Sequence, residues 1–420
     1  MFTKEDPKEK LPTLPQSNYP SIINIEGIEK LLRNINISKA SGPDDIPNWI
    51  LKNCAYEIAP FIANIFQLSL DTGILPSDWR DANISYVFKK GDKHTASNYR
   101  PISLTSVLCK TLEHIIYRHI LQHLERYNIL TSLRHGFRSG HSCESQLVIT
   151  MHDIMKTFDL KLQTDLLILD FSKAFDAVPH KKLLHKLNSY GINGTTHKWI
   201  GQFLTARKHQ VVIDGERLRS CSVHSGVPQG TVLGLLLFLC YINDLPSCVI
   251  SQVRLFADDC LLYRSIKSIN DQIHNNKIYS HSKSGQLQWG MRFNATKCYL
   301  MTINISKNPL TFDYTLDSHN LEKVTENPYL GITISDNLKW NTNINKISNK
   351  ASSMLCFIRR NLRHCTSSLK QTAYVSLIRS VMYYSCVVWG PYLRKDIDKL
   401  ENIQRRAVRF VKMITAGIAA

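Results

Sequence analysis

Hydrophobic residues recur along the chain with two different periods, which predict helices and strands in different places. The apolar run at residues 166–169 ends in Asp170, a pattern typical of a buried strand. Residues 254–263 predict two short strands around an Asp-Asp tip. Helical spacing predicts one helix after the turn at Pro101, with apolar residues Leu108, Leu112, Ile115, Ile116, Ile120 and Leu124. It predicts another near the end of the chain, with apolar residues Ile397, Leu400, Ile403, Ala407 and Val411. Terminal helices with short strands between them favour an α+β fold.

Composition and charge narrow the class of protein. Of the 420 residues, 43% are hydrophobic and 20% charged, a balance typical of folded proteins. Lys and Arg number 52 against 34 Asp and Glu, so the formal net charge is +18. A positive field of this size favours polyanionic partners, although a merely soluble basic protein has the same composition.

Cysteine spacing and hydropathy bear on the compartment. The eleven cysteines are scattered without a Cys-x-x-Cys pair or zinc-ligand spacing, which predicts reduced thiols in an intracellular protein. The longest apolar run, residues 232–242, is shorter than the about 20 residues that a helix needs to cross a bilayer. We therefore expect no membrane insertion and a nuclear and/or cytoplasmic location.

Carboxylates stand at the ends of two predicted buried strands, at Asp170 and at Asp258 with Asp259. Burying an unpaired carboxylate is costly, so such residues usually have a cation or a hydrogen-bond donor as partner. A pair of Mg²⁺ ions bridged by these side chains would activate a primer hydroxyl and stabilise a departing pyrophosphate. The alternative is structural, because Asp is also common at helix N-caps and in polar hairpin turns.

Eight motifs in a fixed order make the sequence resemble the reverse transcriptases of non-LTR retrotransposons, particularly the jockey and LINE-like group. They are KASGPDDIPNWILK, FKKGDKHTASNYRPISL, HGFRSGHSCESQL, LDFSKAFDAVPH, SGVPQGTVLGLLLFLCYINDLP, RLFADDCLLY, FNATKC and YLGITISDNLKW. The later segments YSCVVWGPY and LENIQRRAVRF resemble the thumb region of that family. The resemblance extends from about Ile28 to about Val411, nearly the whole chain.

The resemblance implies a right-hand polymerase fold with fingers, a palm containing an antiparallel sheet, and a helical thumb. On this basis we expect a flexible lead-in at residues 1–27 and fingers, interleaved with the palm, at residues 28–164. The palm with the catalytic aspartates would span residues 165–335, and the helical thumb residues 336–420.

The resemblance also assigns the metal-binding groups. Asp170 and Asp258 match the family's two metal-binding carboxylates, Asp259 completes the Asp-Asp pair, and the backbone carbonyl of Phe171 would add one oxygen. The implied cofactor is a pair of Mg²⁺ ions, with Mn²⁺ as a substitute. Lys297 matches a lysine that would protonate the leaving pyrophosphate.

Further matches concern the incoming nucleotide. Lys89 and Arg100 would grip its triphosphate, although solvated surface charge is the usual role of such residues. Phe175 matches the ring that crowds a ribose 2′-hydroxyl, and a plain core aromatic is its alternative. In the motif GVPQG, Gly226 and Gly230 would let the backbone approach a base or the template closely, and Gln229 would offer a hydrogen-bond donor and acceptor. The alternative is a structural turn without a ligand, which is the usual role of a Gly-Pro-rich segment.

Two segments match contacts to primer and template. Tyr329, Leu330 and Gly331 correspond to the family's primer-grip turn. The basic side chains of Arg405, Arg406 and Arg409 would lie along the duplex backbone without reading sequence, or else form an ordinary solvated helix face.

Three positions depart from the family pattern. Leu235 stands where proline is usual, and we expect little damage because leucine is a good helix former. The stretch before Trp289 lacks the family's usual earlier tryptophan, so the helix that packs beneath the palm in the family is less certain to form here. Asn343 stands where the family commonly has a histidine.

These matches predict an RNA-directed DNA polymerase that extends a DNA 3′ end on an RNA template with deoxynucleoside triphosphates. No room for the family's usual endonuclease is found before the polymerase motifs, so we expect a truncated copy or fragment whose nicking activity comes from elsewhere. A catalytically inactive nucleic-acid-binding relic is the alternative. A polymerase like that of group II intron maturases is disfavoured by GVPQGTVLG and YINDLP.

Overall fold

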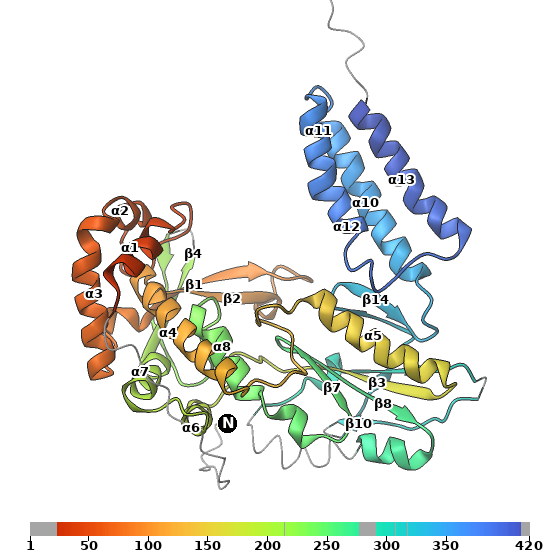
Figure 1. Cartoon of the computed structure of the whole chain (residues 1–420), viewed down its shortest axis with the longest axis horizontal. Helices are drawn as coiled ribbons and strands as arrows, with labels where there is room; N and C mark the ends of the chain where they lie inside the picture. The colour runs from red at the N-terminus through yellow and green to blue at the C-terminus, as the bar shows by residue number, and fades with distance from the viewer. Residues whose placement is uncertain (1–22, 214, 277–290, 307, 317, 413–420) are drawn as a thin grey trace, which may run out of the picture. The chain divides into compact units, whose positions relative to one another are not determined.

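A computed structural model describes residues 23–213, 215–276, 291–306, 308–316 and 318–412 of the chain. These residues form two compact units, each assembled from segments far apart in the sequence. The first comprises the described residues within Met1–Ser132, Phe171–Val249 and Ser280–Phe293, and the second those within Leu133–Asp170, Ile250–Tyr279 and Asn294–Ala420. Both units mix helices with sheets, in agreement with the predicted α+β class (Figure 1).

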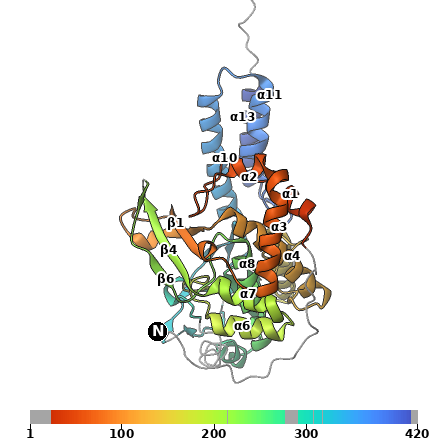
Figure 2. The ribbon, with the colours of Figure 1, turned by 90° about the vertical axis from the view of Figure 1, so that its left-hand side faces the viewer.

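The first unit packs helices against one sheet. Its helices are α1 (Ile25–Arg33), α2 (Asn48–Asn53), α3 (Ala55–Thr72), α4 (Val107–Arg126), α6 (His180–Ser189), α7 (Gly194–Leu204) and α8 (Val232–Ile242). Its strands are β1 (Asp81–Phe88), β2 (Tyr99–Leu104), β4 (Arg207–Ile213), β5 (Glu216–Arg217) and β6 (Cys221–Val223). The strand order is β2-β1-β4-β5 with β6 also paired to β4, and only the β1–β4 pair among these is parallel. Figure 2 shows α3, α7 and α6 following one another along the helical part of this unit.

Helix α8 is apolar on all sides and is therefore buried in the centre of the first unit. It contacts both α4 and α6. Thr231 is its N-cap, and the hydroxyl of this residue accepts a hydrogen bond from the N–H of Gly234 at 3.1 Å. The helix runs through Leu235 without interruption, so the family's proline is not needed to start it.

The second unit is built on a five-stranded sheet and a helical bundle. The sheet contains β3 (Gln163–Asp170), β7 (Gln252–Phe256), β8 (Asp259–Ile266), β9 (Tyr299–Ile303) and β12 (Glu322–Lys323) in the order β12-β9-β3-β8-β7. Two small hairpins accompany it, β10 (Thr315–Leu316) with β11 (His319–Asn320) and β13 (Glu326–Tyr329) with β14 (Ile332–Ser335). The helices are α5 (Cys143–Asp159), α10 (Asn341–Asn361), α11 (Ser367–Ala373), α12 (Ser380–Met382) and α13 (Arg394–Lys412).

Strand β3 is the central strand of this sheet and pairs antiparallel with both β8 and β9. Its near-continuous burial agrees with the sequence prediction of a buried strand. Helix α5 packs on the sheet through Leu147, Met151 and Ile154, which share one hydrophobic core with Leu166 of β3. A separate apolar cluster joins α10, α12 and α13, drawn in blue in Figure 1.

Most elements predicted from hydrophobic spacing are found. The helix after Pro101 is α4, the strand ending in Asp170 is β3, the Asp-Asp hairpin is β7–β8, and the terminal stripe belongs to α13. Helix α1 begins at Ile25, three residues inside the segment expected as lead-in, while residues 1–22 lie outside the described part of the chain. Trp289 and the stretch before it also lie outside the described residues.

Candidate active site

Two acidic residues face each other at one end of the sheet in the second unit. Asp170 is the last residue of β3, and its registered partner across the ladder is Asp259, the first residue of β8. Because directly opposed residues of an antiparallel pair project to the same face, both carboxylates leave the sheet together. The backbone ladder thus sets the spacing of these two side chains.

Asp258 lies in the tight turn that joins β7 to β8. Phe256 pairs with Asp259, so Ala257 and Asp258 are the two central residues of a two-residue hairpin loop. Ala257 has a φ of 53°, which such loops require at their first central position and which is costly for a residue other than glycine.

A neighbouring segment braces this strained turn. Arg134 is fully buried, and its Nη2 donates a hydrogen bond to the carbonyl of Ala257 at 3.2 Å. Gly136 approaches the turn so closely that an added Cβ would lie 2.5 Å from the backbone nitrogen of Ala257. The N–H of Leu255 also donates to the carbonyl of Leu133 at 3.2 Å. The segment from Leu133 to Gly136 therefore holds the hairpin that carries Asp258 and Asp259.

Three carboxylates and one ammonium set the electrostatics of this edge. Burial among protein atoms, followed by repulsion from Asp258 and Asp170, raises the pKa of Asp259 to about 6. The ammonium of Lys297 lies 3.6 Å from Oδ2 of Asp170 and gives it a cationic neighbour. Both side chains are open to solvent, so this ion pair adds little stability.

This edge has the donor chemistry that divalent cations prefer. Carboxylate oxygens are hard ligands for Mg²⁺ or Mn²⁺, and a bound cation would relieve the repulsion that raises the pKa of Asp259. Within the described residues, no three His, Cys, Asp or Glu side chains are already gathered closely enough to hold a metal ion. The structure thus brings Asp170 opposite Asp259 and puts Asp258 in the adjoining turn without preforming a complete coordination shell.

The residues that follow Asp170 belong to the first unit. Phe171 forms an isolated bridge with Phe293, and their rings stack at 4.5 Å between centroids. Phe175 is 8% exposed and stacks on Phe238 of α8 at 4.4 Å. Most of the Phe175 ring is therefore a core contact, and its remaining exposed edge is small.

The GVPQG loop is fastened to the turn that carries Phe175. The N–H of Val227 donates to the carbonyl of Phe175, and that of Gly226 to the carbonyl of Val178, both at 2.8 Å. Gly226 has a φ of 89°, and an added Cβ would lie 2.7 Å from the Cα of Asp176. Both the conformation and the close approach require glycine at this position.

Gln229 and Gly230 connect this loop to the sheet and to α8. The carbonyl of Gln229 accepts from the N–H of Ser103 at 2.8 Å. Just beyond Gly230, the first two N–H groups of α8 donate to the fully buried carboxylate of Glu113 at 2.8 and 2.9 Å. An anion at a helix N-terminus is favourable, so Glu113 anchors the start of α8 and the end of the loop.

Lys89 and Arg100 lie on the β1–β2 hairpin, and both are exposed. The N–H of Lys89 donates to the carbonyl of Asn98 at 2.9 Å, and Arg100 is paired with Val87. Alternation along the strand puts Lys89 on the same side as Val87, and hence on the same face of the hairpin as Arg100.

The residues expected at the primer form a tight turn in the second unit. Tyr329 ends β13 with a buried ring, and Leu330 and Gly331 both have positive φ, at 45° and 89°. The hydroxyl of Tyr384 donates to the carbonyl of Leu330 at 2.8 Å, and an added Cβ on Gly331 would lie 2.8 Å from the Tyr384 ring. Tyr384 therefore fixes the shape of this turn.

The basic residues of α13 are exposed, whereas Ile403, Ala407 and Phe410 of the same helix are buried. Arg405, Arg406 and Arg409 are among these exposed residues, and Arg405 makes an ion pair with Glu401 at 2.7 Å. Asn343 has a structural contact of its own: it is buried in α10, and its Oδ1 accepts from the N–H of Thr333 at 3.0 Å.

A family model described as reverse transcriptase (RNA-dependent DNA polymerase) matches residues 88–334, more than half of the chain. The chain belongs to this family. An RNA-directed DNA polymerase from the mobile element jockey of Drosophila melanogaster is 25% identical over 402 residues, covering 93% of this chain and 44% of its own length. The jockey polymerase of Drosophila funebris is 24% identical, covering 92% and 43%. A probable RNA-directed DNA polymerase from transposon BS of Drosophila melanogaster is 26% identical over 418 residues, covering 93% of this chain and 44% of its own length.

The resemblance to reverse transcriptases of non-LTR elements is thereby confirmed, although this chain spans less than half the length of these relatives. The structure adds residues that motif comparison alone did not single out, namely Arg134, Gly136, Glu113 and Tyr384. Each is a supporting residue whose partner lies far away in the sequence. Among the helices described, none is both long and apolar enough to cross a membrane.

Proposed function

We propose that this reverse transcriptase family member is an RNA-directed DNA polymerase, which extends a DNA 3′ end along an RNA template with deoxynucleoside triphosphates. The main support is the opposed pair of Asp170 and Asp259 beside Asp258, within a chain whose family and relatives carry that name. The proposed subdivision into fingers, palm and thumb follows from the same resemblance, with the five-stranded sheet as palm and α10–α13 as thumb.

The residues at the end of β3 and at the β7–β8 turn would provide the chemistry of nucleotidyl transfer. Asp170, Asp258, Asp259 and the carbonyl of Phe171 are the proposed ligands of two Mg²⁺ ions. When bound, such a pair activates the primer 3′-hydroxyl for attack and neutralises charge on the departing pyrophosphate. Lys297 stands beside Asp170 with an ammonium within reach of the same edge, so it is the proposed donor of a proton to that pyrophosphate.

The first unit would bind the incoming nucleotide. Lys89 and Arg100 share one exposed face of the β1–β2 hairpin, and we assign them to the triphosphate. The exposed edge of Phe175 would exclude a 2′-hydroxyl, because its position is fixed by stacking on Phe238. Gln229 and Gly230 would contact the base pair from the anchored GVPQG loop.

Nucleic acid would be held by the turn at Leu330 and by the basic face of α13. The positive-φ turn, whose shape is fixed by Tyr384, would lie along the sugar-phosphate chain of the primer. Arg405, Arg406 and Arg409 would contact phosphates without sequence preference.

Primer extension on an RNA template tests this proposal directly. Purified chain should extend a DNA primer with deoxynucleotides and Mg²⁺, and Asp258→Asn should abolish extension while leaving RNA binding intact. Asp313→Asn, an exposed acid elsewhere in the same unit, is the matched control. Extension that is unaffected by Asp258→Asn contradicts the metal assignment. Salt-sensitive RNA binding without any extension by wild type would instead identify an inactive relic.

A further inference from the structure

The segment that runs beside the end of β3 makes a bulge to which the proposed function gives no role. On this side the regular ladder stops where Ile168 pairs with Tyr299, the first residue of β9. Further along β3, the carbonyl of Asp170 accepts from the N–H of Asn294 at 2.7 Å. Two steps along β3, from 168 to 170, thus face five steps along the other chain, from 299 to 294. The extra residues form the short 3-10 helix Ala295–Lys297.

This segment binds both main-chain groups of Asp170. The N–H of Asp170 donates to Sγ of Cys298 at 3.5 Å, and the thiol of Cys298 donates to the carbonyl of Asp170 at 3.9 Å, beside the bond from Asn294. The N–H and C=O of one residue in an antiparallel ladder point to the same side, so those of Asp170 point away from β8. Asp170 and Asp259 are therefore a non-hydrogen-bonded pair, the kind in which side chains lie closer together. The segment from Asn294 to Cys298 thus holds the main chain of Asp170.

The thiol of Cys298 suits this position by its burial and its chemistry. Cys298 is 1% exposed, so bulk water does not compete for its two contacts. A thiol has a weak donor and a weak acceptor, and both are used on Asp170. Removing the sulfur would take this acceptor from the N–H of Asp170, which is costly where water cannot replace it.

The same bulge sets the place of Lys297. This residue ends the 3-10 helix directly before Cys298, and its ammonium lies 3.6 Å from Oδ2 of Asp170. Bulges beside active sites commonly re-aim a side chain, because the extra residues break the regular alternation of the strand. One anchored turn therefore determines both the main chain of the acid and the approach of the cation.

We propose that Cys298 is a positioning residue: through the main chain of Asp170 it fixes that carboxylate for metal binding, and it anchors the turn that carries Lys297. The inference rests on the proposed function, because it concerns the same carboxylate. Cys298 acts through Asp170 and not on the metal or the nucleotide itself. Loss of its sulfur should therefore weaken the binding of divalent cations in a chain that remains folded.

Mn²⁺ binding to the full chain, followed by electron paramagnetic resonance, tests this without requiring polymerase activity. Cys298→Val keeps a small apolar side chain and removes both contacts, so it should weaken Mn²⁺ binding about tenfold, and Cys298→Ala should do the same. Cys298→Ser retains a donor and an acceptor and should bind Mn²⁺ nearly as wild type does. Where wild type extends a primer, Cys298→Val should lower kcat about tenfold and leave the KM for deoxynucleotides nearly unchanged.

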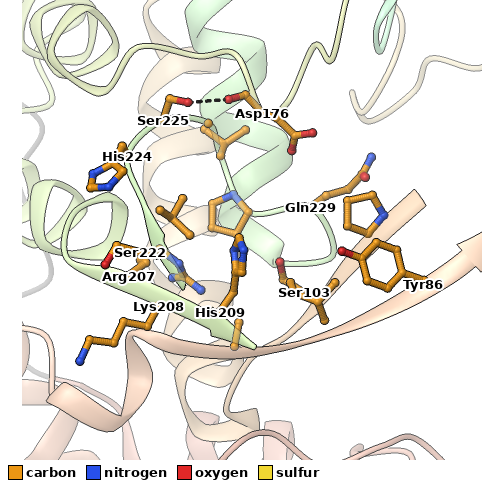
Figure 3. A pocket seen from close by; sticks show the side chains of 17 residues that line it. Tyr86, Ser103, Asp176, Arg207, Lys208, His209, Ser222, His224, Ser225 and Gln229 are labelled. Carbon is orange, nitrogen blue, oxygen red and sulfur yellow. Dashed lines mark hydrogen bonds between the residues drawn. The ribbon is translucent and has the colours of Figure 1, made fainter. Parts of the chain in front are cut away.

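Two controls separate positioning from packing and from charge. Cys260→Val makes the same change at a thiol of β8 that is 2% exposed and lies opposite Leu169, and it should bind Mn²⁺ as wild type does. Asp176→Asn removes an acid from the same motif as Asp170. Figure 3 shows that the Asp176 side chain lines a pocket of about 400 Å³ in the first unit, so this variant should also keep its Mn²⁺ affinity.

Unchanged Mn²⁺ affinity in both Cys298→Val and Cys298→Ala, with native circular dichroism, overturns the proposal. A loss in Cys298→Ser or in Cys260→Val equal to that in Cys298→Val also overturns it, because packing alone would then explain the effect. Absence of Mn²⁺ binding by wild type overturns it together with the metal assignment. Wild type that binds Mn²⁺ without extending a primer contradicts the proposed function alone, and the order of the Mn²⁺ affinities still decides the role of Cys298.

Discussion

Asp259 is the residue we expect to destabilise the metal-free protein at neutral pH. Its pKa rises from the ordinary 3.8 to about 6, first through burial and then through repulsion by Asp258 and Asp170. The folded state therefore binds this proton more tightly than the unfolded state. The stability contributed by protonation is fully present below pH 3.8 and is lost as the pH rises through about 6.

The size of the effect follows from that difference in pKa. A difference of this kind corresponds to roughly 3 kcal/mol if it is fully expressed in the free energy of unfolding. Asp259 is surrounded by protein atoms on one side and still open to water on the other, so solvent screening reduces the expected penalty to on the order of 1 kcal/mol. Asp259→Asn removes the charge and keeps the shape, so it should raise the Tm of the second unit by roughly 2–4 °C at pH 7 without metal.

Thermal unfolding followed by circular dichroism measures this, in EDTA at pH 4 and pH 7 and again with Mg²⁺. Wild type should lose stability between the two pH values in EDTA, and Asp259→Asn should lose less. Added Mg²⁺ should stabilise wild type more than the variant. Glu322→Gln, an exposed acid on the same sheet, is the control and should follow wild type. A variant that melts at or below the wild-type temperature at pH 7 refutes the idea of a repulsive carboxylate cluster.

Three further substitutions probe the supporting residues. Gly136→Ala should lower the free energy of unfolding by about 1–3 kcal/mol, because the added Cβ would lie 2.5 Å from the backbone nitrogen of Ala257. Gly390→Ala is the control, since an added Cβ there meets open space and should leave the free energy of unfolding unchanged. Equal effects of the two substitutions would rule out the clash. Phe175→Ala should cost about 3–4 kcal/mol in denaturant unfolding through lost packing and should lower the preference for deoxynucleotides in kcat/KM, and a fully stable variant would contradict the stacking. Glu113→Ala should lower the free energy of unfolding by roughly 1–3 kcal/mol, because it leaves the N–H groups of Val232 and Leu233 without an acceptor. An unchanged free energy of unfolding would show that water replaces the carboxylate.

The periodic elements and the acidic residues could be predicted from the sequence because their signals are local. Helix α4 shows apolar residues at helical spacing, and β3 is a short apolar run that ends in Asp170. The motif that contains Asp258 and Asp259 is a hairpin because strand-forming residues flank a short polar turn. Such patterns need only neighbouring residues.

The supporting contacts could not be predicted, because each depends on one side chain meeting a distant backbone group. Arg134 meets Ala257 across 123 positions, Glu113 meets Val232 across 119, and Tyr384 meets Leu330 across 54. A buried arginine or glutamate has no periodic signature. The pocket in Figure 3 is equally hidden, since its walls come from four strands and a loop that meet only in the fold.

The central place of β3 has a consequence for how such enzymes diverge. Asp170 and Asp259 keep their separation through main-chain ladders on both sides of this strand, and main-chain atoms are the same whatever the residue. Substitutions in the apolar layer beneath can therefore accumulate without moving the two acids.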